Sequence, residues 1–554
     1  MFLPGFQANP NKKIQLIHFG GLDLRPKAAA GSLSQCENLS SSAFPALTPC
    51  PSRRRAAELS GIVTPAAPEY APEPLSAFTG AAAGSFYYQG KKIDGPPLLP
   101  GRKSIADFNG KLCIFPDKLC FDYLPHPDTG TVSQKLESME KVLTLSGVSF
   151  YSSHNDLTGA YTAYLSKSKG GFDRFVPGES LVISGCKNSA NNTRRLQGRK
   201  DYAGENAIVS AVVEKASANR LDLLLYNKRG NRACFENGTE SGEITVKVSI
   251  PDMDHVCVHN NRLWGTGQNG EYLYASKLGD CLNFNAFRGL GDDSWYSMVG
   301  TPGNFTGICS YRSGVVAFKR DCIHHIYGDA PQNFSIPKQT MGGCIDGRSI
   351  AELGGALYYL SAAGFQSYRG GEPEPISPQL PCAYSACAAG TDGRRYYAAA
   401  YRDQEGCDLL VFDPIHNLWH REDSTPFLGF FRHGGRLYAA TEDALFELNA
   451  GREIPNWSFT TCPITLDAMT HKAPAALWLR MDAEENVPVS VEISADGKPF
   501  TLCETTKGKG FGVSRIPIRF VPCDSFRLRV SGKGAAVIHQ LELITYQGGK
   551  TYGR

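Results

Sequence analysis

The sequence predicts an all-β protein: a β-propeller with an inserted small β-barrel and a C-terminal β-sandwich. Composition is the first observation behind this prediction. The 58 glycines, and 24 Tyr and 29 Phe against only 7 Met, favour strands joined by tight turns over helical bundles. The second observation is a series of turn–strand–turn–strand units along the chain. The third is the alternation of apolar and polar residues near the C-terminus.

Length and charge bound the class of protein. With 554 residues the chain is long enough for several hydrophobic cores, which predicts about three to four domains. The formal net charge of +3 is too small to indicate nucleic-acid binding on electrostatic grounds. The N-terminus has no basic region followed by an apolar one, and no run reaches the roughly 18 apolar residues of a membrane span. We therefore expect a protein without a membrane span that is made and folded in a cytoplasm.

The 17 cysteines are odd in number and form no C-x-x-C pair. Zinc sites need tightly paired ligands, and no histidines cluster beside these cysteines. We therefore expect small buried thiols that are kept reduced, and we predict neither a metal nor a cofactor.

The chain begins with an arm over residues 1–60. This arm is turn-rich, has little periodicity and ends near Arg53-Arg54-Arg55, a run that as bare chemistry indicates a solvated charge patch. Residues 61–145 follow as the first part of the propeller. They open with an extended Pro- and Ala-rich connector, "TPAAPEYAPEPL", and continue into short strand pairs joined by Asn-Gly and Pro-Asp turns.

The second part of the propeller spans residues 251–454. Units such as "HNNRLWGTGQNGEYLYASK", "YRSGVVAFKRDCIHHIYG" and "LGGALYYLSAAGFQSYRGG" each start at a Gly or Asn turn, enter a strand and turn again. Their starts fall about 40 to 50 residues apart, which is the period of four-stranded propeller blades. One such blade cannot bury both of its faces alone, so we expect blades that pack face to face around an axis.

The stretch "LLVFDPIHNLWHRED" is typical of one hairpin in such a blade, and it resembles a turn common in kelch-like propellers. Pro414 presets φ at the turn, and Asp413 and Asn417 can bond local amides. Trp419 then supplies a large apolar anchor. We predict that these residues serve turn formation and packing.

A second polar cluster, "HNNRLWG", admits two interpretations. As a functional site, Asn260, Asn261 and Arg262 would form a binding surface on a face of the propeller. As structure, the two asparagines after His259 form a turn, and Arg262 to Trp264 enter the next strand. We favour the structural interpretation.

Two regions depart from the blade period. Residues 146–250 are typical of a small closed barrel inserted between two blades, and residues 455–554 alternate as in a β-sandwich. The barrel contains the polar loop "NSANNTRRLQGRK", whose cations are Arg194, Arg195, Arg199 and Lys200. These cations could contact a polyanion, but we favour an exposed barrel loop.

The sequence carries no recognisable catalytic site. No G-x-S-x-G, Walker A or H-E-x-x-H motif occurs. Sialidases are hydrolytic propellers, but "RIP" lies here at Arg515 to Pro517, in the sandwich rather than near the start of the propeller. The adjacent acids Asp292 and Asp293 lack the Asp-box spacing, and neighbouring acids on a strand or turn point apart and are usually solvated. We therefore predict that the protein is not an enzyme.

Several segments together resemble a known family. They are the arm "GGLDLR…NLS…FPALTP", the strand entry "FNGKL", the insert "FVPGESLVISG", and the propeller segments "IPDMDHVCVHNNRLWG", "YASKLGDCLNFNAF" and "FTGICSYRSGVVAFKRDCIHHIYGDAPQNFSI". This pattern resembles β-propeller structural proteins from the tail-gene regions of bacteriophages and prophages. It is more loosely similar, at the level of fold, to the packaged-DNA stabilisation (nozzle) proteins of short-tailed phages.

The resemblance implies a structural component of a bacteriophage virion, in the tail or head-tail (nozzle) assembly, that acts as a rigid oligomeric scaffold. Its implied partners are other copies of itself in a ring and neighbouring tail or head-tail proteins, with transient passage of phage DNA as a further possibility. Its implied location is the virion, assembled in the cytoplasm of the bacterial host. A closed propeller suits this use because it has no long free edges to aggregate.

Two alternatives from other classes stay open. One is a receptor- or glycan-binding propeller protein at the phage tail tip, where aromatic platforms on one propeller face would bind sugars. The other is a secreted or lysosome-like glycan hydrolase, which needs clustered acids in the propeller centre and a signal sequence, neither of which is visible in the sequence.

Overall fold

The computed structural model describes residues 12–61, 63–66, 78–125, 130, 132–133, 135–194, 206–337, 340–380, 383–403, 406–465, 471–518 and 522–547. Most of the predicted connector, and Arg195, Arg199 and Lys200 of the cationic loop, lie outside the described residues. The chain divides into two compact units. Unit 1 comprises Met1–Leu59, Arg348–Arg369 and Pro373–Arg554, and unit 2 comprises Ser60–Gly347 and Gly370–Glu372.

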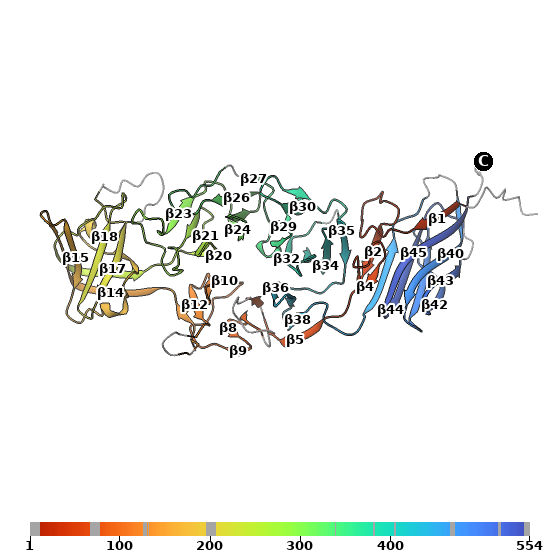
Figure 1. Cartoon of the computed structure of the whole chain (residues 1–554), viewed down its shortest axis with the longest axis horizontal. Coiled ribbons are helices and arrows are strands. Elements are labelled where there is room, and N and C mark those ends of the chain that lie inside the picture. The colour runs from red at the N-terminus through yellow and green to blue at the C-terminus, as the bar shows by residue number, and fades with distance from the viewer. Residues whose placement is uncertain are drawn as a thin grey trace, which may run out of the picture. The chain divides into compact units, whose positions relative to one another are not determined.

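The chain is all-β, with propeller blades, an inserted barrel and a C-terminal sandwich, so the predicted fold class is confirmed (Figure 1). The described helices are short 3-10 turns: η1 (Phe172–Arg174), η2 (Ser189–Asn191) and η3 (Gly347–Ser349). The blades are four-stranded antiparallel sheets, and within the described residues four lie in unit 2 and three in unit 1.

The blades of unit 2 consist of consecutive strands. The first two sheets are β6 (Val63–Pro65), β7 (Gly80–Ala82), β8 (Ser85–Tyr88) and β9 (Lys91–Lys92), then β10 (Ser104–Phe108), β11 (Lys111–Phe115), β12 (Leu119–Asp122) and β13 (Glu137–Ser138). The next two are β20 (Met253–His259), β21 (Arg262–Gly267), β22 (Tyr272–Ala275) and β23 (Trp295–Met298), then β24 (Phe305–Tyr311), β25 (Gly314–Lys319), β26 (Cys322–Tyr327) and β27 (Thr340–Met341).

The blades of unit 1 differ in one respect, because the last takes a strand from the arm. The first two sheets are β28 (Ala351–Leu353), β29 (Ala356–Ser361), β30 (Gly364–Tyr368) and β31 (Glu374–Pro375), then β32 (Ala386–Thr391), β33 (Tyr396–Arg402), β34 (Gly406–Asp413) and β35 (Leu418–Arg421). The last sheet is β36 (Gly429–His433), β37 (Arg436–Ala440), β38 (Ala444–Glu447) and β5 (Arg54–Glu58). Figure 1 shows β5 beside β38.

Consecutive blades pack face to face, as propeller blades do. The first strands of successive sheets contact one another: β10 with β20 and β20 with β24 in unit 2, β28 with β32 and β32 with β36 in unit 1. The hydrophobic cores lie between neighbouring sheets. Phe115 of β11 shares a core with Leu263 of β21, and Trp264 of β21 shares one with Val315 of β25. Every residue of β25 and β29 is buried, because both faces of these strands are covered.

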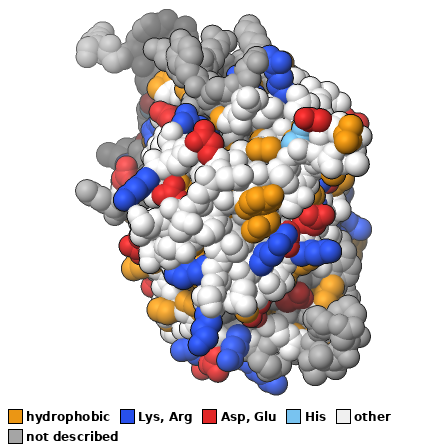
Figure 2. All heavy atoms as spheres, turned by 90° about the vertical axis from the view of Figure 1, so that its left-hand side faces the viewer, with side chains coloured by type: hydrophobic (Ala, Val, Ile, Leu, Met, Phe, Trp, Pro, Cys, Tyr) orange, Lys and Arg blue, Asp and Glu red, His pale blue; other side chains and the backbone are white. Residues whose placement is uncertain are grey.

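The insert is a closed six-stranded barrel in the order β14-β15-β18-β17-β16-β19. Its strands are β14 (Lys141–Asn155), β15 (Ala160–Ser166), β16 (Ser180–Ser184), β17 (Ser210–Ala216), β18 (Arg220–Tyr226) and β19 (Gly238–Val248), against the predicted range 146–250. Inward-facing residues such as Phe150, Leu165 and Leu223 form its own core. Figure 2 faces the barrel and shows Lys, Arg, Asp and Glu interspersed with scattered hydrophobic side chains. Exposed apolar residues of the barrel include Val142 and Leu157.

The sandwich takes strands from both ends of the chain. Its C-terminal strands are β39 (Asn456–Thr461), β40 (Lys472–Ala483), β41 (Pro488–Ala495), β42 (Thr501–Lys507), β43 (Gly510–Pro517), β44 (Phe526–Lys533) and β45 (Ala536–Gln547). The arm adds β1 (Lys12–Leu16) to the sheet β1-β45-β40-β43 and β2 (Leu33–Glu37) to the sheet β2-β39-β44-β41-β42 (Figure 1). A short ribbon of β3 (Leu39–Ser40) and β4 (Thr48–Pro49) follows.

The arginine run at the end of the arm is solvated in part: Arg54 and Arg55 are exposed, as the composition indicates, whereas the Arg53 side chain is only 16% exposed. The Arg53 guanidinium lies 3.3 Å from a Glu422 carboxylate oxygen and 2.8 Å from one of Asp423. Arg54 forms an ion pair with Glu447 of β38. The reason is long-range: pairing of β5 with β38 places these cations beside acids more than 350 residues away, which the local sequence does not reveal.

Candidate functional site

The "FDPIHNLW" turn joins β34 to β35, and Asp413 is its organising residue. One carboxylate oxygen of Asp413 accepts hydrogen bonds from the amides of Ile415 (3.0 Å) and His416 (3.3 Å). The other lies 2.6 Å from Ser41 Oγ of the arm, which donates to it, and 2.9 Å from His416 Nδ1. Burial raises the pKa of Asp413, but the hydrogen bonds from His416 and Ser41 outweigh it and hold the pKa below its usual value.

The same turn is completed by Pro414 at its start and Asn417 near its end. Asn417 has φ 55°, a left-handed conformation that asparagine tolerates better than most residues. Trp419 is fully buried, and its Nε1 donates to the carbonyl oxygen of Ile376 at 2.8 Å. Asp413 and Trp419 are therefore buried against the arm and a neighbouring blade, whereas the tip of the turn from Ile415 to Asn417 is exposed.

Ser41, Asp413 and His416 are the residue types of a hydrolase triad in the wrong order. A nucleophilic serine must contact the histidine, and the carboxylate must orient the far side of the imidazole. Here the Asp413 carboxylate lies between the other two groups. The ring of Phe44 also stacks on His416 with centroids 4.3 Å apart. The arrangement fixes the arm to the blade and does not activate a nucleophile.

The "HNNRLWG" stretch forms the hairpin between β20 and β21. His259 and Arg262 are paired in register, with Asn260 (φ 46°) and Asn261 (φ 53°) as the two residues of a left-handed turn. The Nδ1 atom of His259 lies 2.8 Å from Ser310 Oγ. The Oδ1 atom of Asn261 accepts a hydrogen bond from Asn109 Nδ2 at 2.7 Å. The two asparagines thus make the turn, and one of them links two neighbouring blades.

Arg262 and Trp264 point into the blade rather than outward. Arg262 is 1% exposed and donates to the carbonyl oxygens of Ser276 (2.7 Å), Gly291 (2.7 Å) and Asp293 (2.5 Å). Burial lowers the pKa of its guanidinium. Trp264 packs against Trp295, with ring centroids 5.7 Å apart. Both side chains thereby support the segment 289–295.

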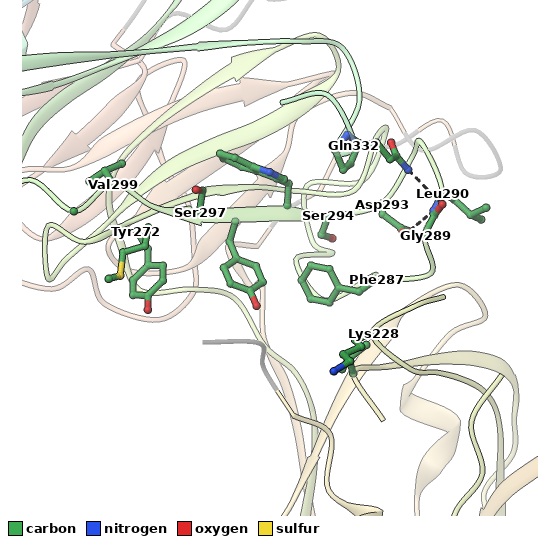
Figure 3. Close-up of a pocket in the computed structure, with 16 residues that line it drawn as sticks. Lys228, Tyr272, Phe287, Gly289, Leu290, Asp293, Ser294, Ser297, Val299 and Gln332 are labelled. Carbon is green, nitrogen blue, oxygen red and sulfur yellow. Dashed lines mark hydrogen bonds between the residues drawn. The ribbon is translucent and has the colours of Figure 1, made fainter. Parts of the chain in front are cut away.

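That segment forms part of a groove of about 1010 Å³ in unit 2 (Figure 3). Strands β22 and β23 contribute Tyr272, Trp295, Tyr296, Ser297 and Met298, and the loop between them contributes Phe287, Gly289, Leu290, Asp293 and Ser294. Val209 and Lys228 come from the barrel, Val299 and Gly300 follow β23, and Pro331 and Gln332 follow β26. Figure 3 shows Tyr272 and Phe287 on the blade side of the opening and Lys228 across from them.

The aromatic side chains of the groove are partly exposed and lie at angles to one another. The Tyr272 and Tyr296 ring centroids are 6.5 Å apart with the planes tilted by 54°. Phe287 meets Tyr296 edge to face at 5.6 Å and 79°. Tyr272, Phe287 and Tyr296 each retain intermediate solvent exposure. None of these rings covers the face of another completely, so the groove presents aromatic surface to a ligand.

The acids beside the groove are engaged in holding its wall. Arg288 Nε donates to Asp293 at 2.9 Å, and Arg288 Nη2 donates to Asp292 at 2.6 Å. The Asp293 carboxylate also accepts from the amides of Arg288 and Leu290. Asp293 is buried and Asp292 is half-buried, so the prediction that neighbouring acids are solvated is wrong for Asp293. The shared arginine is the reason, because it compensates two neighbouring carboxylates.

Sequence reasoning missed the groove, although one local signal was present. Alternation in "EYLYAS" places Tyr272 and Tyr274 on one face of β22, and β22–β23 pairing sets Tyr274 opposite Tyr296. The pairing, and the contributions of the barrel and of the residues after β26, depend on contacts between segments far apart in sequence.

In the described part of the chain, neither the thiols nor the possible metal ligands form a second candidate site. The described cysteines are free, and burial raises the pKa of Cys36 and Cys407 to about 12. No group of three or more described His, Cys, Asp or Glu side chains is placed to hold a metal ion. Among the described residues, no helix has the length and apolar character needed to cross a membrane.

No family model and no curated protein matches the chain. Similar solved structures include an exo-beta-1,3-galactanase from Phanerochaete chrysosporium with galactose, with TM-score 0.22 and 9% identity over 52% of this chain and 94% of that one. They also include the GH43 protein BlXynB from Bacillus licheniformis, with TM-score 0.21 and 9% identity over 53% and 98% of the two chains. A Cry1Da tryptic core variant from Bacillus thuringiensis has TM-score 0.16 and 9% identity over 52% and 50%. Similarities this low carry no argument about activity.

Proposed function

We propose that the chain is a structural component of a bacteriophage virion, in the tail or head-tail (nozzle) assembly, where it acts as an oligomeric β-propeller scaffold. The sequence resemblance suggests this class, and the course of the arm is the observation that carries the proposal. The proposed role includes no catalysis and requires no cofactor. Its partners are other copies of the chain and neighbouring virion proteins, with transient passage of DNA as a further possibility.

The arm connects the separate β-modules of unit 1. β1 pairs with β45 in one sandwich sheet and β2 with β39 in the other, while β5 completes the last blade. Between these strands, the Ser41 hydroxyl donates to the Asp413 carboxylate, and the backbone amide of Asn38 donates to the Glu422 carbonyl oxygen at 2.8 Å. Backbone pairing of this kind resists relative movement of the modules, because any movement would break buried hydrogen bonds. This is the property that a scaffold needs.

Unit 1 also offers a surface for neighbouring subunits. In the described part of the chain, β42 and β43 are terminal strands of the two sandwich sheets. They carry the exposed apolar residues Leu502, Phe511 and Val513, of which Phe511 is 69% exposed. Terminal strands with apolar side chains favour association with another chain. We expect this surface to contribute to contacts between copies.

The full chain tests the proposal directly. We expect association that increases with concentration in light scattering, and rings in negative-stain images. The double variant Phe511→Lys/Val513→Lys should weaken association, whereas Val142→Lys/Leu157→Lys on the barrel should not, and all three proteins should keep the same Tm. A monodisperse monomer at every concentration, with no rings, would contradict the scaffold proposal.

A further inference from the structure

We propose that the groove shown in Figure 3 binds an oligosaccharide built from pyranose rings and does not cleave it. This inference goes beyond the scaffold role and is independent of it, because it rests on unit 2 residues that do not contribute to the arm or the sandwich. It also gives the glycan-binding alternative raised by the sequence a specific location.

The aromatic residues of the groove match the apolar faces of sugar rings. One face of a pyranose presents several C–H groups, which pack on the electron-rich face of an aromatic ring. Tyr272, Phe287 and Tyr296 provide partly exposed rings at neighbouring positions. Their mutual tilts of 54° and 79° leave ring surface toward the opening. A ligand of two or more linked rings can therefore contact more than one of these side chains.

Polar groups lie among these rings, as recognition of sugar hydroxyls requires. Tyr272 and Ser297 carry hydroxyls that donate and accept, and Lys228 on the barrel side provides a cationic donor. The exposed Gln332 lies at the margin, where its Nε2 donates to the Gly289 carbonyl oxygen at 3.3 Å. The volume of about 1010 Å³ lies at the upper end of the range typical of small-ligand sites, about 300–1,000 Å³. Aromatic surface with a few hydrogen-bonding groups is the combination that such ligands need.

The wall of the groove is held in place before any ligand binds. The Arg262 guanidinium donates to the carbonyl oxygens of Gly291 and Asp293, and the Asp293 carboxylate accepts a hydrogen bond from the Leu290 amide at 3.0 Å. A fixed wall reduces the entropy lost on binding. The buried hydrogen bonds of Arg262 and Asp293 therefore favour ligand binding by the loop 289–295.

The charges indicate binding rather than hydrolysis. Most glycosidases use two carboxyl groups on opposite sides of the scissile bond. Among the described residues that line the groove, Asp293 is the only acid, and its carboxylate is held by Arg288 Nε at 2.9 Å and by backbone amides. A carboxylate committed in this way does not transfer a proton to a leaving group. Sugars bound here are expected to leave unchanged.

An array of immobilised pyranose oligosaccharides, probed with the labelled full chain, tests the inference. We expect at least one saccharide to bind, with its affinity then measured by titration calorimetry. Tyr272→Ala and Phe287→Ala should each lower the affinity for that saccharide by about tenfold or more, because stacking surface is lost. Tyr272→Phe keeps the ring and should retain most of the affinity. Chromatography of the incubated saccharide should show no shorter products.

Tyr151→Ala provides the matched control, because Tyr151 is a partly exposed tyrosine of the barrel that does not line the groove. It should leave the affinity unchanged, and all variants should keep the circular dichroism spectrum of the wild type. The inference is overturned if no saccharide binds, or if the bound saccharide is indifferent to Tyr272→Ala and Phe287→Ala. A groove that captures only a protein partner would overturn it as well. None of these results depends on whether the chain forms rings.

Discussion

Two asparagine-containing turns with a buried tryptophan nearby have opposite surroundings in this molecule. The turn from Asp413 to Trp419 in unit 1 is attached to the arm, with Ser41 bonded to the carboxylate and Phe44 stacked on His416. The hairpin from His259 to Trp264 in unit 2 instead supports a groove that is open to solvent, through Arg262 and Trp264.

The difference shows that similar local chemistry can serve assembly in one place and a ligand in another. Both stretches contain a turn that tolerates positive φ and a tryptophan that anchors a strand. What separates them is the next layer of contacts. At the first turn these contacts come from the arm, through Ser41 and Phe44. At the second turn they are made to the loop that carries Gly291 and Asp293 and forms a wall of the open groove. Predictions that compare the two turns therefore test the assignment of roles.

The largest expected effect is that of Trp419→Ala. Trp419 is fully buried against Phe365 and Phe412, and its removal leaves a large cavity and an unpaired Ile376 carbonyl oxygen. We expect a loss of about 3–5 kcal/mol in the free energy of unfolding, measured by denaturant titration. Sugar binding at the groove, measured where the variant is folded, should not change.

Trp295→Ala is the matched change at the groove. Trp295 is only partly buried, so its loss should cost less unfolding free energy than Trp419→Ala while altering the groove. If Trp295→Ala destabilised the protein more than Trp419→Ala, the distinction between the buried anchor of the first turn and the open groove would be wrong.

The contrast also shows how far the sequence could be interpreted. The fold class, the blade period, and the turn role of Asp413 and Asn417 follow from composition and local spacing, because turn chemistry is local. The strands of the arm could not be found in this way, since β2 pairs with β39 more than 400 residues later. The same holds for Arg262, which looks like an exposed cation in "HNNRLWG" until Gly291 and Asp293 are placed over it.

Arg262→Met should have the next largest effect on the free energy of unfolding, and it should also change binding at the groove. The change keeps apolar bulk but removes three hydrogen bonds from a buried cation, which leaves the Gly291 and Asp293 carbonyl oxygens without this donor. We expect a loss of about 2–3 kcal/mol in unfolding free energy. Saccharide affinity should also fall, since the wall is no longer held. Unchanged affinity in a folded Arg262→Met protein would argue against a preorganised groove.

Asp413 makes the stability of the turn that is attached to the arm depend on pH. Its folded-state pKa lies below the unfolded value of about 3.9, so its stabilising effect is present above that pH and is lost as pH falls through the folded pKa. We expect Asp413→Ala to cost about 1–2 kcal/mol at neutral pH, through the lost bonds to Ser41 and the turn amides.

Asp413→Asn keeps an acceptor for the Ile415 amide but removes the charge. Its unfolding free energy should approach that of the wild type below about pH 3.9, as the native carboxylate becomes protonated. A difference between the two proteins that stayed constant with pH would contradict this assignment. Melting curves at matched ionic strength measure it.

The smallest effects separate the two turns most directly. Asn417 and Asn261 both have positive φ, so alanine at either position should cost about 1 kcal/mol, because an L-residue with a Cβ is strained there. Glycine relieves that strain at both. At Asn417 it should therefore be nearly neutral, whereas at Asn261 it also removes the acceptor for Asn109 Nδ2 and should remain destabilising. In the Asn109→Ala background, Asn261→Gly should lose that additional cost. If the cost persisted there, the link between blades would not be what distinguishes the second turn from the first.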